Sequence, residues 1–386
     1  MSETFSFTDL PAFLTNALTE QGLTEPTDIQ IKMIPEALAG QSLIARSQTG
    51  TGKTLAFLLP ALAKIEQDKK GLQAIVLAPT QELAMQVVDV AKNLTKNHPI
   101  EIGAFIGGAN IKRQVERLKK QKPQLAIGTP GRLLELIEMK KLKIHEVQVV
   151  AIDEADRMMA ERPSWEATMQ IAKRAGRDTQ FLFVSATIPK DFSAQVADVA
   201  PFVVQVEAEG GLLETEKVEH LFIRVDTRDR IDMARRLIHA EKIEKGIVFV
   251  NQLDTVSETA EKFTYRGIKA LPLSSEQSKQ EREQALNQFR KGETHILVAT
   301  DVAARGLDVD DVTHIIQLDP PASPDSYLHR AGRTGRMGKA GTVITLIDPK
   351  SEYKLEKYRR DLKIELAERF LAHGRLSDDT RNKTRR

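Results

Sequence analysis

The sequence contains no cysteine, and this absence excludes several kinds of chemistry at once. Without thiols the chain forms no disulfides, has no thiolate nucleophile and offers no cysteine ligands to zinc or iron–sulfur centres. A large excess of charge of one sign is also missing, since 56 basic residues against 54 acidic ones leave a formal net charge of +2. A field this weak does not draw the whole chain onto nucleic acid, so any phosphate binding must come from local groups.

Long apolar runs are missing as well. No run of about 18 apolar residues occurs, and the start, MSETFSFTDL, lacks a basic segment followed by an apolar one. We therefore expect a cytoplasmic protein without membrane contact. What is present is an ordinary globular composition, 41% hydrophobic and 28% charged, over 386 residues. This length fits two domains of roughly 150–200 residues each.

Short apolar runs that favour β-strands alternate with helical stretches, and this pattern occurs twice. The first series lies at 74–77, 125–127, 147–152 and 181–184, and the second lies at 221–225, 247–250, 296–298, 314–318 and 343–347. Strands that alternate with helices predict a parallel sheet. The expected fold class is therefore α/β, with two tandem domains that are each a mostly parallel sheet flanked by helices.

The two series are separated by VEAEGGLLETEKVE, in which two glycines and several glutamates interrupt the apolar periodicity as a flexible link would. We place the first domain at 1–206, the link at 207–218 and the second domain at 219–370. Residues 371–386 are expected to form a short basic tail, and the last dozen, RLSDDTRNKTRR, to be frayed.

The segment SLIARSQTGTGKTLAFLLP predicts a strand, a glycine-containing loop and a helix that begins at Lys53. Gly50 and Gly52 permit backbone angles that let successive N–H groups cradle phosphate oxygens at a helix N-terminus. Lys53 adds a charge for the β- and γ-phosphates, and the Thr54 hydroxyl can ligate Mg²⁺. The alternative is a glycine turn before an amphipathic helix.

Two carboxylates, Asp153 and Glu154, follow the apolar run of VQVVAIDEADRMM. In open parallel sheets, ligands bind at the carboxyl ends of strands. Asp153 can then hold Mg²⁺ through its water shell, and Glu154 can orient and deprotonate the water that attacks the γ-phosphate. The alternative is that acidic residues merely favour a helix N-terminus.

The second half contains YLHRAGRTGRMGKAG, where Arg330, Arg333 and Arg336 recur every three residues. This spacing predicts guanidinium groups on one side, where they could stabilise the charge that develops on a γ-phosphate. A solvated helix face is the alternative.

In this order the motifs resemble the DEAD-box family of RNA helicases, from about residue 5 to residue 348. GLTEPTDIQ is similar to the Q motif; SQTGTGKT, DEAD and SAT at 185–187 to motifs I, II and III; TDVAARGLD and HRAGRTGR to motifs V and VI. PTQELA, the glycines at 107–108 and TPGR are similar to the family's RNA-side motifs. The resemblance implies two RecA-like domains, ATP and Mg²⁺ as cofactors, and RNA bound through its backbone phosphates and 2′-hydroxyls without sequence specificity.

The resemblance also assigns residues. Nucleotide binding would use Phe7 (or Phe5), Thr27, Gln30, Ser47, Gln48, Thr49, Gly50, Thr51, Gly52, Lys53, Thr54, Gly306 and Asp308, with Gln30 facing adenine. Catalysis would use Lys53, Asp153, Glu154, Arg333 and Arg336, with Thr54 and Asp153 on the metal. Coupling between the sites would use Asp156, Ser185, Thr187 and His329. RNA binding would use Pro79, Gln81, Gly108, Thr129, Pro130, Gly131, Arg132 and Thr300.

The TPGR segment has physical support as a phosphate-binding site. Thr129 is a residue type that caps helix N-termini, Pro130 suits the first helical position, and Gly131 lets a backbone approach closely.

Several positions depart from the family pattern. Gln81 stands where the family has Arg, which removes a cation on the RNA side, and Leu23 replaces a usual aromatic beside adenine. Separately from the family pattern, Ser47 stands where the common phosphate-loop pattern GxxxxGK[ST] has its first glycine. In LSSEQSKQER, Ser274, Ser275 and Lys279 replace His, Gly and Gln, while Arg282 keeps its place.

The function that we expect is an RNA-dependent ATPase that remodels RNA duplexes or RNA–protein complexes by ATP-driven closure of two domains, acting as a monomer. A ribonucleoprotein or ribosome-assembly context is compatible with this reading. One alternative is an ATP-gated RNA clamp that unwinds little, and another is a DNA-dependent translocase.

Overall fold

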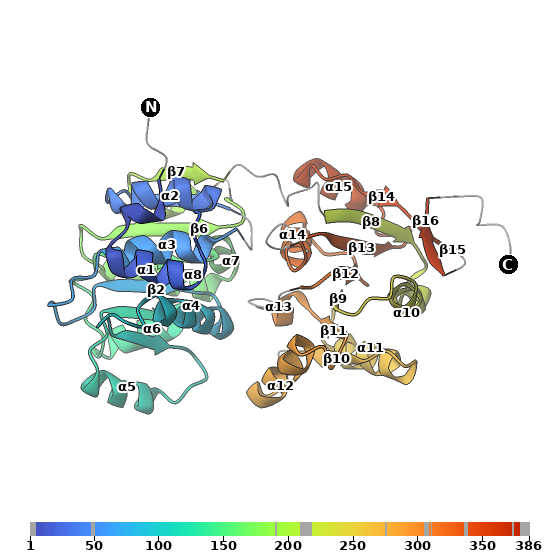
Figure 1. The fold of residues 1–386 in the computed structure, drawn as a ribbon, viewed down its shortest axis with the longest axis horizontal. Coiled ribbons are helices and arrows are strands. Elements are labelled where there is room, and N and C mark those ends of the chain that lie inside the picture. Colours follow the sequence, from blue (N-terminus) through green and yellow to red (C-terminus); the bar gives the residue numbers. More distant parts are fainter. Residues whose placement is uncertain are drawn as a thin grey trace. The chain divides into compact units, whose positions relative to one another are not determined.

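The computed structural model describes residues 5–47, 51–189, 191–208, 218–274, 276–304, 309, 311–335, 339–372 and 374–378. The chain divides into two compact units, Met1–Glu209 and Gly210–Arg386. Within the described residues each unit contains one seven-stranded parallel sheet, blue to green and yellow to red in Figure 1. Residues 209–217 of the expected link lie outside the described residues.

The sheet of the first unit has the strand order β3-β4-β2-β5-β6-β1-β7. Its central strands are buried on both faces because helices cover both sides, which explains their continuous apolar runs. The strands are β1 (Leu43–Arg46), β2 (Ala74–Leu77), β3 (Ile102–Phe105), β4 (Leu125–Gly128), β5 (Val149–Ile152), β6 (Gln180–Ser185) and β7 (Val204–Glu207).

Two helical layers cover this sheet, and each buries its own apolar cluster. One face carries α1 (Ala12–Glu20), α2 (Asp28–Leu38), α3 (Lys53–Ala63) and α4 (Gln81–Leu94). The other face carries α5 (Ile111–Lys120), α6 (Pro130–Glu138), α7 (Ala155–Ala160), α8 (Arg162–Arg174) and α9 (Phe192–Val196). A 3₁₀ turn at Phe7–Asp9 precedes α1.

The second unit repeats this plan, with the strand order β10-β11-β9-β12-β13-β8-β14. Its strands are β8 (Val218–Arg224), β9 (Gly246–Phe249), β10 (Ala270–Leu273), β11 (Ile296–Ala299), β12 (His314–Gln317), β13 (Gly341–Ile347) and β14 (Ala367–Glu368). One apolar cluster lies under α12 (Lys279–Arg290), α13 (Asp301–Ala304), α14 (Pro324–Ala331) and α15 (Tyr353–Leu362). The other lies under α10 (Arg230–Ala240), which follows a 3₁₀ turn at Thr227–Asp229, and α11 (Asp254–Tyr265).

All nine apolar runs named from the sequence are strands in the structure, and the α/β fold class is confirmed. Four strands of the two seven-stranded sheets were not predicted from the sequence. They are the edge strands of these sheets, β3, β7, β10 and β14. An edge strand is less buried, so it needs fewer apolar residues, and β10 even accommodates Pro272.

The expectation of a frayed tail was wrong for its first part. Residues Phe370–Ala372 (β15) and Arg375–Ser377 (β16) form an antiparallel hairpin, because Leu371 and Leu376 pack against the apolar cluster under α10. Residues 379–386 of the expected tail lie outside the described residues. No helix in the described part of the chain is both long and apolar enough to cross a bilayer.

Candidate active site

The motif loops of the first unit follow adjacent strands at one edge of the sheet. The phosphate-loop segment follows β1, the Ser-Ala-Thr segment follows β6 and the two carboxylates follow β5, and these three strands are neighbours. The PTQELA, glycine-pair and TPGR segments follow β2, β3 and β4, which are also neighbours. In a parallel sheet the carboxyl ends of all strands lie on the same side. The residues that follow these carboxyl ends therefore form two adjoining groups.

The phosphate-loop residues on either side of the loop contact each other. The Ser47 N–H donates to the Ser185 carbonyl at 2.9 Å, and the Ser47 and Thr51 hydroxyl oxygens are 2.5 Å apart. Lys53, which is buried, donates from Nζ to the Ser47 carbonyl at 2.8 Å. Thr54 follows in the first turn of α3 and is half-buried. Gln48, Thr49 and Gly50 lie outside the described residues.

Gln30 joins the Q-motif segment to the phosphate loop. As the third residue of α2 it forms a capping box with Thr27, in which the Thr27 N–H donates to Gln30 Oε1 at 2.9 Å. Its Nε2 donates to the Gly52 carbonyl at 3.0 Å. Gly52 has φ of 90°, and a Cβ there would collide with the Gln30 amide, so the close approach requires glycine. One Nε2 hydrogen and one Oε1 lone pair remain for a base.

The predicted upstream aromatics are core residues in the structure. Phe7 is 4% exposed and Phe5 is 9% exposed, and their rings pack edge to face at 6.3 Å. Leu23, the departure beside adenine, packs against the same apolar cluster.

Asp153 and Glu154 are both buried where β5 leads into α7. Glu154 has a left-handed backbone, with φ of 49°, and its N–H donates to Asp153 Oδ1 at 2.9 Å. Burial raises the pKa of Asp153 to about 7, with a further contribution from the Glu154 charge that Lys53 partly offsets. Asp153, Glu154 and Lys53 therefore lie close together although burial removes water from their charged groups, and such an arrangement is typical of functional sites.

Arg157, one turn along α7, holds the carboxylate of Glu154. Arg157 Nη1 lies 2.8 Å from Glu154 Oε2, and both side chains are almost fully buried. Sequence reasoning missed this residue, although its position three residues after Glu154 at a helix start was a usable signal.

Asp156 connects the carboxylate loop to the Ser-Ala-Thr segment. The N–H and hydroxyl of Thr187 donate to Asp156 Oδ2 at 2.9 and 2.7 Å. The Asp156 N–H donates to Ser185 Oγ at 3.2 Å, and the Ser185 hydroxyl donates to the Thr187 carbonyl. Direct hydrogen bonds therefore join the two segments.

The residues of the second group are also brought together. The Gly107 N–H donates to Thr129 Oγ1 at 3.3 Å, so this hydroxyl contacts the glycine pair rather than capping α6. Gln81 is exposed, and a Cβ at Gly108 would lie 3.2 Å from its Nε2. Arg132 donates from Nη1 to the Ala109 carbonyl at 2.9 Å.

The start of α6 is open at Gly131. Gly131 is exposed, and a Cβ added there would meet nothing within 4 Å, whereas Pro130, the first helical residue, is buried and has no N–H. The Thr129 N–H donates to the Phe105 carbonyl at 3.1 Å. Pro79 is half-buried in the segment that follows β2. The first turn of a helix suits an anionic ligand.

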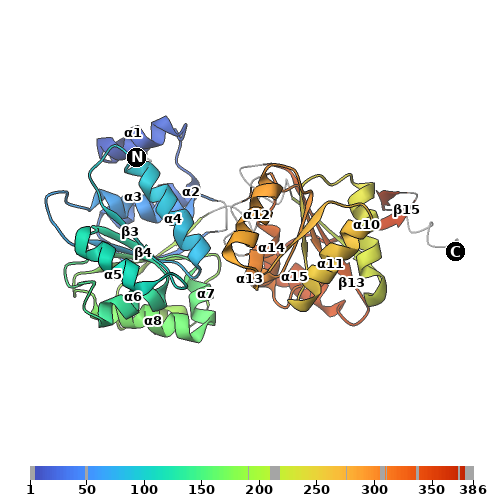
Figure 2. The ribbon, with the colours of Figure 1, turned by 90° about the horizontal axis from the view of Figure 1, so that it is seen from below.

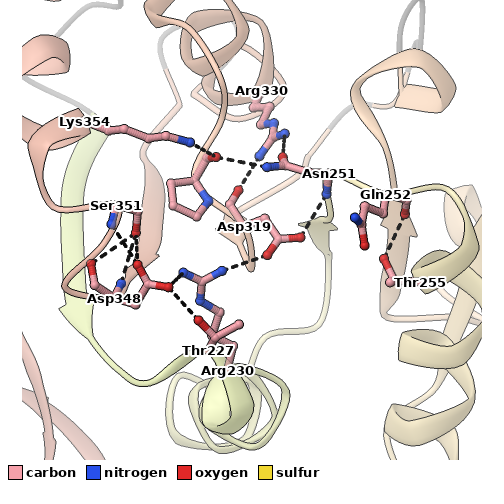
Figure 3. Close-up of polar contacts among 11 residues, drawn as sticks. Thr227, Arg230, Asn251, Gln252, Thr255, Asp319, Arg330, Asp348, Ser351 and Lys354 are labelled. Atoms are coloured by element: carbon pink, nitrogen blue, oxygen red, sulfur yellow. Dashed lines mark hydrogen bonds and ion pairs between the residues drawn. The ribbon is translucent and has the colours of Figure 1, made fainter.

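In the second unit, Arg330 is 1% exposed, and it joins the polar network of Figure 3 through Asn251 and Asp319. Its guanidinium donates to both Asp301 oxygens at 2.5 and 3.1 Å, to the Asp319 carbonyl at 2.7 Å and to Asn251 Oδ1 at 2.7 Å. It thereby joins the segments that follow β9, β11 and β12 to α14.

This network continues to α10 and to the turn between β13 and α15. The Asp319 carboxylate accepts from the Asn251 N–H at 3.0 Å and pairs with Arg230 at 2.8 Å, and Arg230 also pairs with Asp348 at 3.0 Å. Hydrogen bonds from Ser351 and then from Thr227 to Asp348 hold the pKa of this carboxyl low, at about 2 (Figure 3).

The expectation that Arg330, Arg333 and Arg336 share one side was wrong for Arg330. Helix α14 ends at Ala331, and Arg330 points into the network of Figure 3. Arg333 is 6% exposed and donates from Nε to the His329 carbonyl at 3.2 Å. Arg336, Gly306 and Asp308 lie outside the described residues.

The remaining second-unit positions lie near α12 and α13. Thr300 is buried, and its hydroxyl accepts from the Ala303 N–H at 3.3 Å. Arg282 donates from Nη2 to the Ala303 carbonyl at 2.6 Å, which links the two helices. Ser274 is buried, while Ser275 and the Lys279 side chain lie outside what the structure describes.

The residues in the first unit fit a magnesium ion that is held chiefly by a nucleotide. No group of three or more possible protein ligands occurs in the described part of the chain. Mg²⁺ usually keeps several waters and takes only one or two carboxylates together with substrate phosphates. Asp153 supplies one such buried carboxylate; burial and then the Glu154 charge raise its pKa, and a bound cation would oppose both effects.

Comparison with known proteins agrees with this geometry. Residues 27–195 match the family model described as "DEAD/DEAH box helicase", and residues 229–338 match the "Helicase conserved C-terminal domain". The DEAD-box ATP-dependent RNA helicase CshC of Bacillus cereus is 44% identical over 95% of this chain and 93% of its own. The chain belongs to the DEAD-box helicase family.

Other relatives of the family support the same assignment. The probable ATP-dependent RNA helicase YfmL of Bacillus subtilis is 38% identical over 97% of this chain and 99% of its own. The structure of S. cerevisiae Dbp5 bound to RNA and ADP BeF3 superposes with a TM-score of 0.84 at 27% identity, over 94% of this chain and 95% of that one. The two sheets are thus the tandem RecA-like domains of this family.

Proposed function

We propose that this helicase is an RNA-dependent ATPase that opens short RNA duplexes or RNA–protein contacts. The observation that carries the proposal is that two adjoining groups of residues lie at the carboxyl ends of the strands of the first unit. One group carries Lys53, Asp153 and Glu154 in the segments that follow β1 and β5, and the other carries Gly108 and Arg132 in the segments that follow β3 and β4. A nucleotide and an RNA strand would therefore lie on adjoining strands of one rigid sheet.

The nucleotide would bind with its phosphates at the start of α3 and its base against Gln30. Lys53 would exchange its present contact with the Ser47 carbonyl for phosphate oxygens. Asp153 and Thr54 would hold the magnesium ion, which neutralises phosphate charge when bound. Glu154, held by Arg157, would orient the attacking water and accept its proton.

RNA would bind through its backbone at the TPGR helix start and the glycine pair. The open backbone at Gly131, in the first turn of α6, would suit phosphate oxygens and would read no base. The hydrogen bonds between Asp156 and Thr187 give a physical route by which the carboxylate loop and the Ser-Ala-Thr segment respond together.

The second unit would supply Arg333 and Arg336 to the γ-phosphate when the units close, and residues 207–218 would permit that closure. Closure on ATP and RNA would bend the strand away from duplex geometry, and hydrolysis would release it. We propose that the protein does this as a cytoplasmic monomer, with structured or ribonucleoprotein RNA as substrate.

The decisive variant is Glu154→Gln, because it removes the proposed base and keeps the neighbouring Asp153. ATP and RNA binding should persist, while steady-state hydrolysis should fall by at least ~10²-fold. Turnover near that of the parent protein would show that Glu154 is not the base.

The alternative function is an ATP-gated RNA clamp. The observation that favours it is Gln81, a neutral side chain where the family has an arginine on the RNA side. The duplex-release assay separates the two functions: a helicase releases the displaced strand with ATP, whereas a clamp retains RNA with little release. Stimulation of hydrolysis by DNA as strongly as by RNA would instead indicate a DNA-dependent enzyme.

A further inference from the structure

Helix α5 and the turn after it carry a strong local excess of positive charge in a protein whose net charge is only +2. Six basic side chains lie within 112–122 against the single acid Glu116, and all six are exposed. We call them the α5 cations: Lys112, Arg113, Arg117, Lys119, Lys120 and Lys122.

The α5 cations are not balanced by neighbouring carboxylates. None of the six forms a salt bridge to any residue that the structure describes. Cations of other exposed helices do, as in Lys173–Asp198, Lys262–Glu258 and Arg359–Glu356. Unbalanced like charges repel one another, so this arrangement gives a positive potential at the surface that attracts anions.

The helix is fixed with this charge facing outward. Ile111, Val115 and Leu118, at positions i, i+4 and i+7, pack against the apolar cluster under the sheet. Arg113, Arg117 and Lys120 follow the same spacing and form a second row. At 1.5 Å per residue this row is ~10 Å long from Arg113 to Lys120, about three phosphate-to-phosphate steps of ~3.4 Å along one strand of a duplex.

The row begins beside the proposed RNA site. The Asn110 side chain caps α5 by accepting from the N–H groups of Lys112 and Arg113 at 2.9 and 3.4 Å. Arg132 contacts the Ala109 carbonyl immediately before this cap. Figure 1 shows α5 at the end of the sheet beyond α6, and Figure 2 shows the same two helices from below. The glycine pair, the start of α6 and the start of α5 therefore form one continuous surface.

We infer that the α5 cations bind the phosphates of an RNA duplex that adjoins the strand held at Gly108 and Arg132. This inference rests on the proposed function. The segment 109–122 contains no Phe, Tyr or Trp, so it offers no platform on which unpaired bases could stack. A row of cations without aromatics suits phosphate contacts along a duplex, independent of sequence. The surface would favour substrates in which a duplex flanks a single strand.

The test compares two triple variants with equal loss of charge. Arg113→Gln, Arg117→Gln and Lys120→Gln remove the row, while Lys70→Gln, Lys92→Gln and Lys96→Gln remove three exposed cations of the same unit outside α5. The probes are an RNA duplex with a single-stranded extension and the extension alone. Affinity for each is measured by fluorescence anisotropy between 50 and 200 mM salt, with a non-hydrolysable ATP analogue.

For the duplex probe, loss of the row should reduce the slope of log K against log salt by ~2.7, at about 0.9 per phosphate contact. Across this fourfold range of salt the parent should lose ~40-fold more affinity than the variant. The extension alone should bind both equally, and the control triple should match the parent. Unchanged duplex slopes, or an equal effect of the control triple, would overturn the inference.

Two further measurements keep the inference testable. Glu116→Gln removes the only acid of the segment and should raise affinity for the duplex probe severalfold at low salt; no increase would count against the inference. If the parent binds neither probe, the proposed RNA function fails, and this inference fails with it. Binding of the extension with unchanged duplex slopes refutes only the role of α5.

Discussion

Asp153→Asn should make the nucleotide-free protein more stable, although Asp153 is proposed to be essential for activity. Burial and the Glu154 charge raise the pKa of Asp153 from 3.8 to about 7. In the unfolded chain the carboxyl ionises near its ordinary pKa. Between pH 4 and pH 7 the unfolded chain therefore releases a proton that the folded protein keeps, and stability falls as pH rises. Asparagine carries no charge and escapes this cost.

The magnitude follows from the size of the shift. A change from 3.8 to about 7 corresponds to ~4 kcal/mol at about 1.4 kcal/mol per pKa unit. The gain in Asp153→Asn should be ~4 kcal/mol at pH 8 and ~2 kcal/mol at pH 5, where the folded carboxyl is mostly protonated. Magnesium and ATP should reverse the order, because they stabilise the parent and not the variant.

Urea unfolding measures this effect cleanly. The chain has one tryptophan, Trp165 in α8, which is 9% exposed and reports on the first unit alone. Asp156→Asn is the matched control, since Asp156 accepts hydrogen bonds from Arg157 and Thr187. An amide would put a donor in place of one acceptor, so this variant should lose about 1–3 kcal/mol at both pH values. An Asp153→Asn variant no more stable than the parent at pH 8, or a gain that does not shrink at pH 5, would refute the reasoning.

Three other substitutions test the remaining assignments. Gln30→Ala should erase most of a preference for ATP over GTP, expected to be roughly 5–150-fold from an amide–adenine match of ~1–3 kcal/mol; equal hydrolysis of GTP by the parent would contradict the Q-motif assignment. Arg333→Ala should lower kcat for ATP ~10³-fold with little change in ATP affinity, and unchanged kcat would exclude a finger role. Gln81→Arg should steepen the salt slope for single-stranded RNA by roughly 0.7, and an unchanged slope would mean that Gln81 already serves as well as Arg.

The sequence determined the interior of both sheets and the placement of the motif segments directly after their strands. Central strands such as β2 and β11 are buried on both faces, so each is a continuous apolar run that can be recognised in the sequence alone. The phosphate loop and the DEAD carboxylates were placed correctly after β1 and β5, because glycine and acidic residues directly follow strands there.

Only the tertiary structure decided the edges of the sheets and the partners of charged groups. Edge strands such as β3 and β7 are half-exposed, so their sequences carry no continuous apolar run. The hairpin of β15 and β16 depends on packing against α10, which a local reading of a polar tail does not reveal.

Arg330 shows the same division most clearly. Its spacing from Arg333 suggested a shared face, because sequence spacing describes a helix that continues, and α14 ends at Ala331. Its partners Asp301 and Asn251 come from segments 29 and 79 residues away. Such contacts depend on which strands are neighbours in the sheet, and strand order is set by packing of the whole domain rather than by any local pattern of residues.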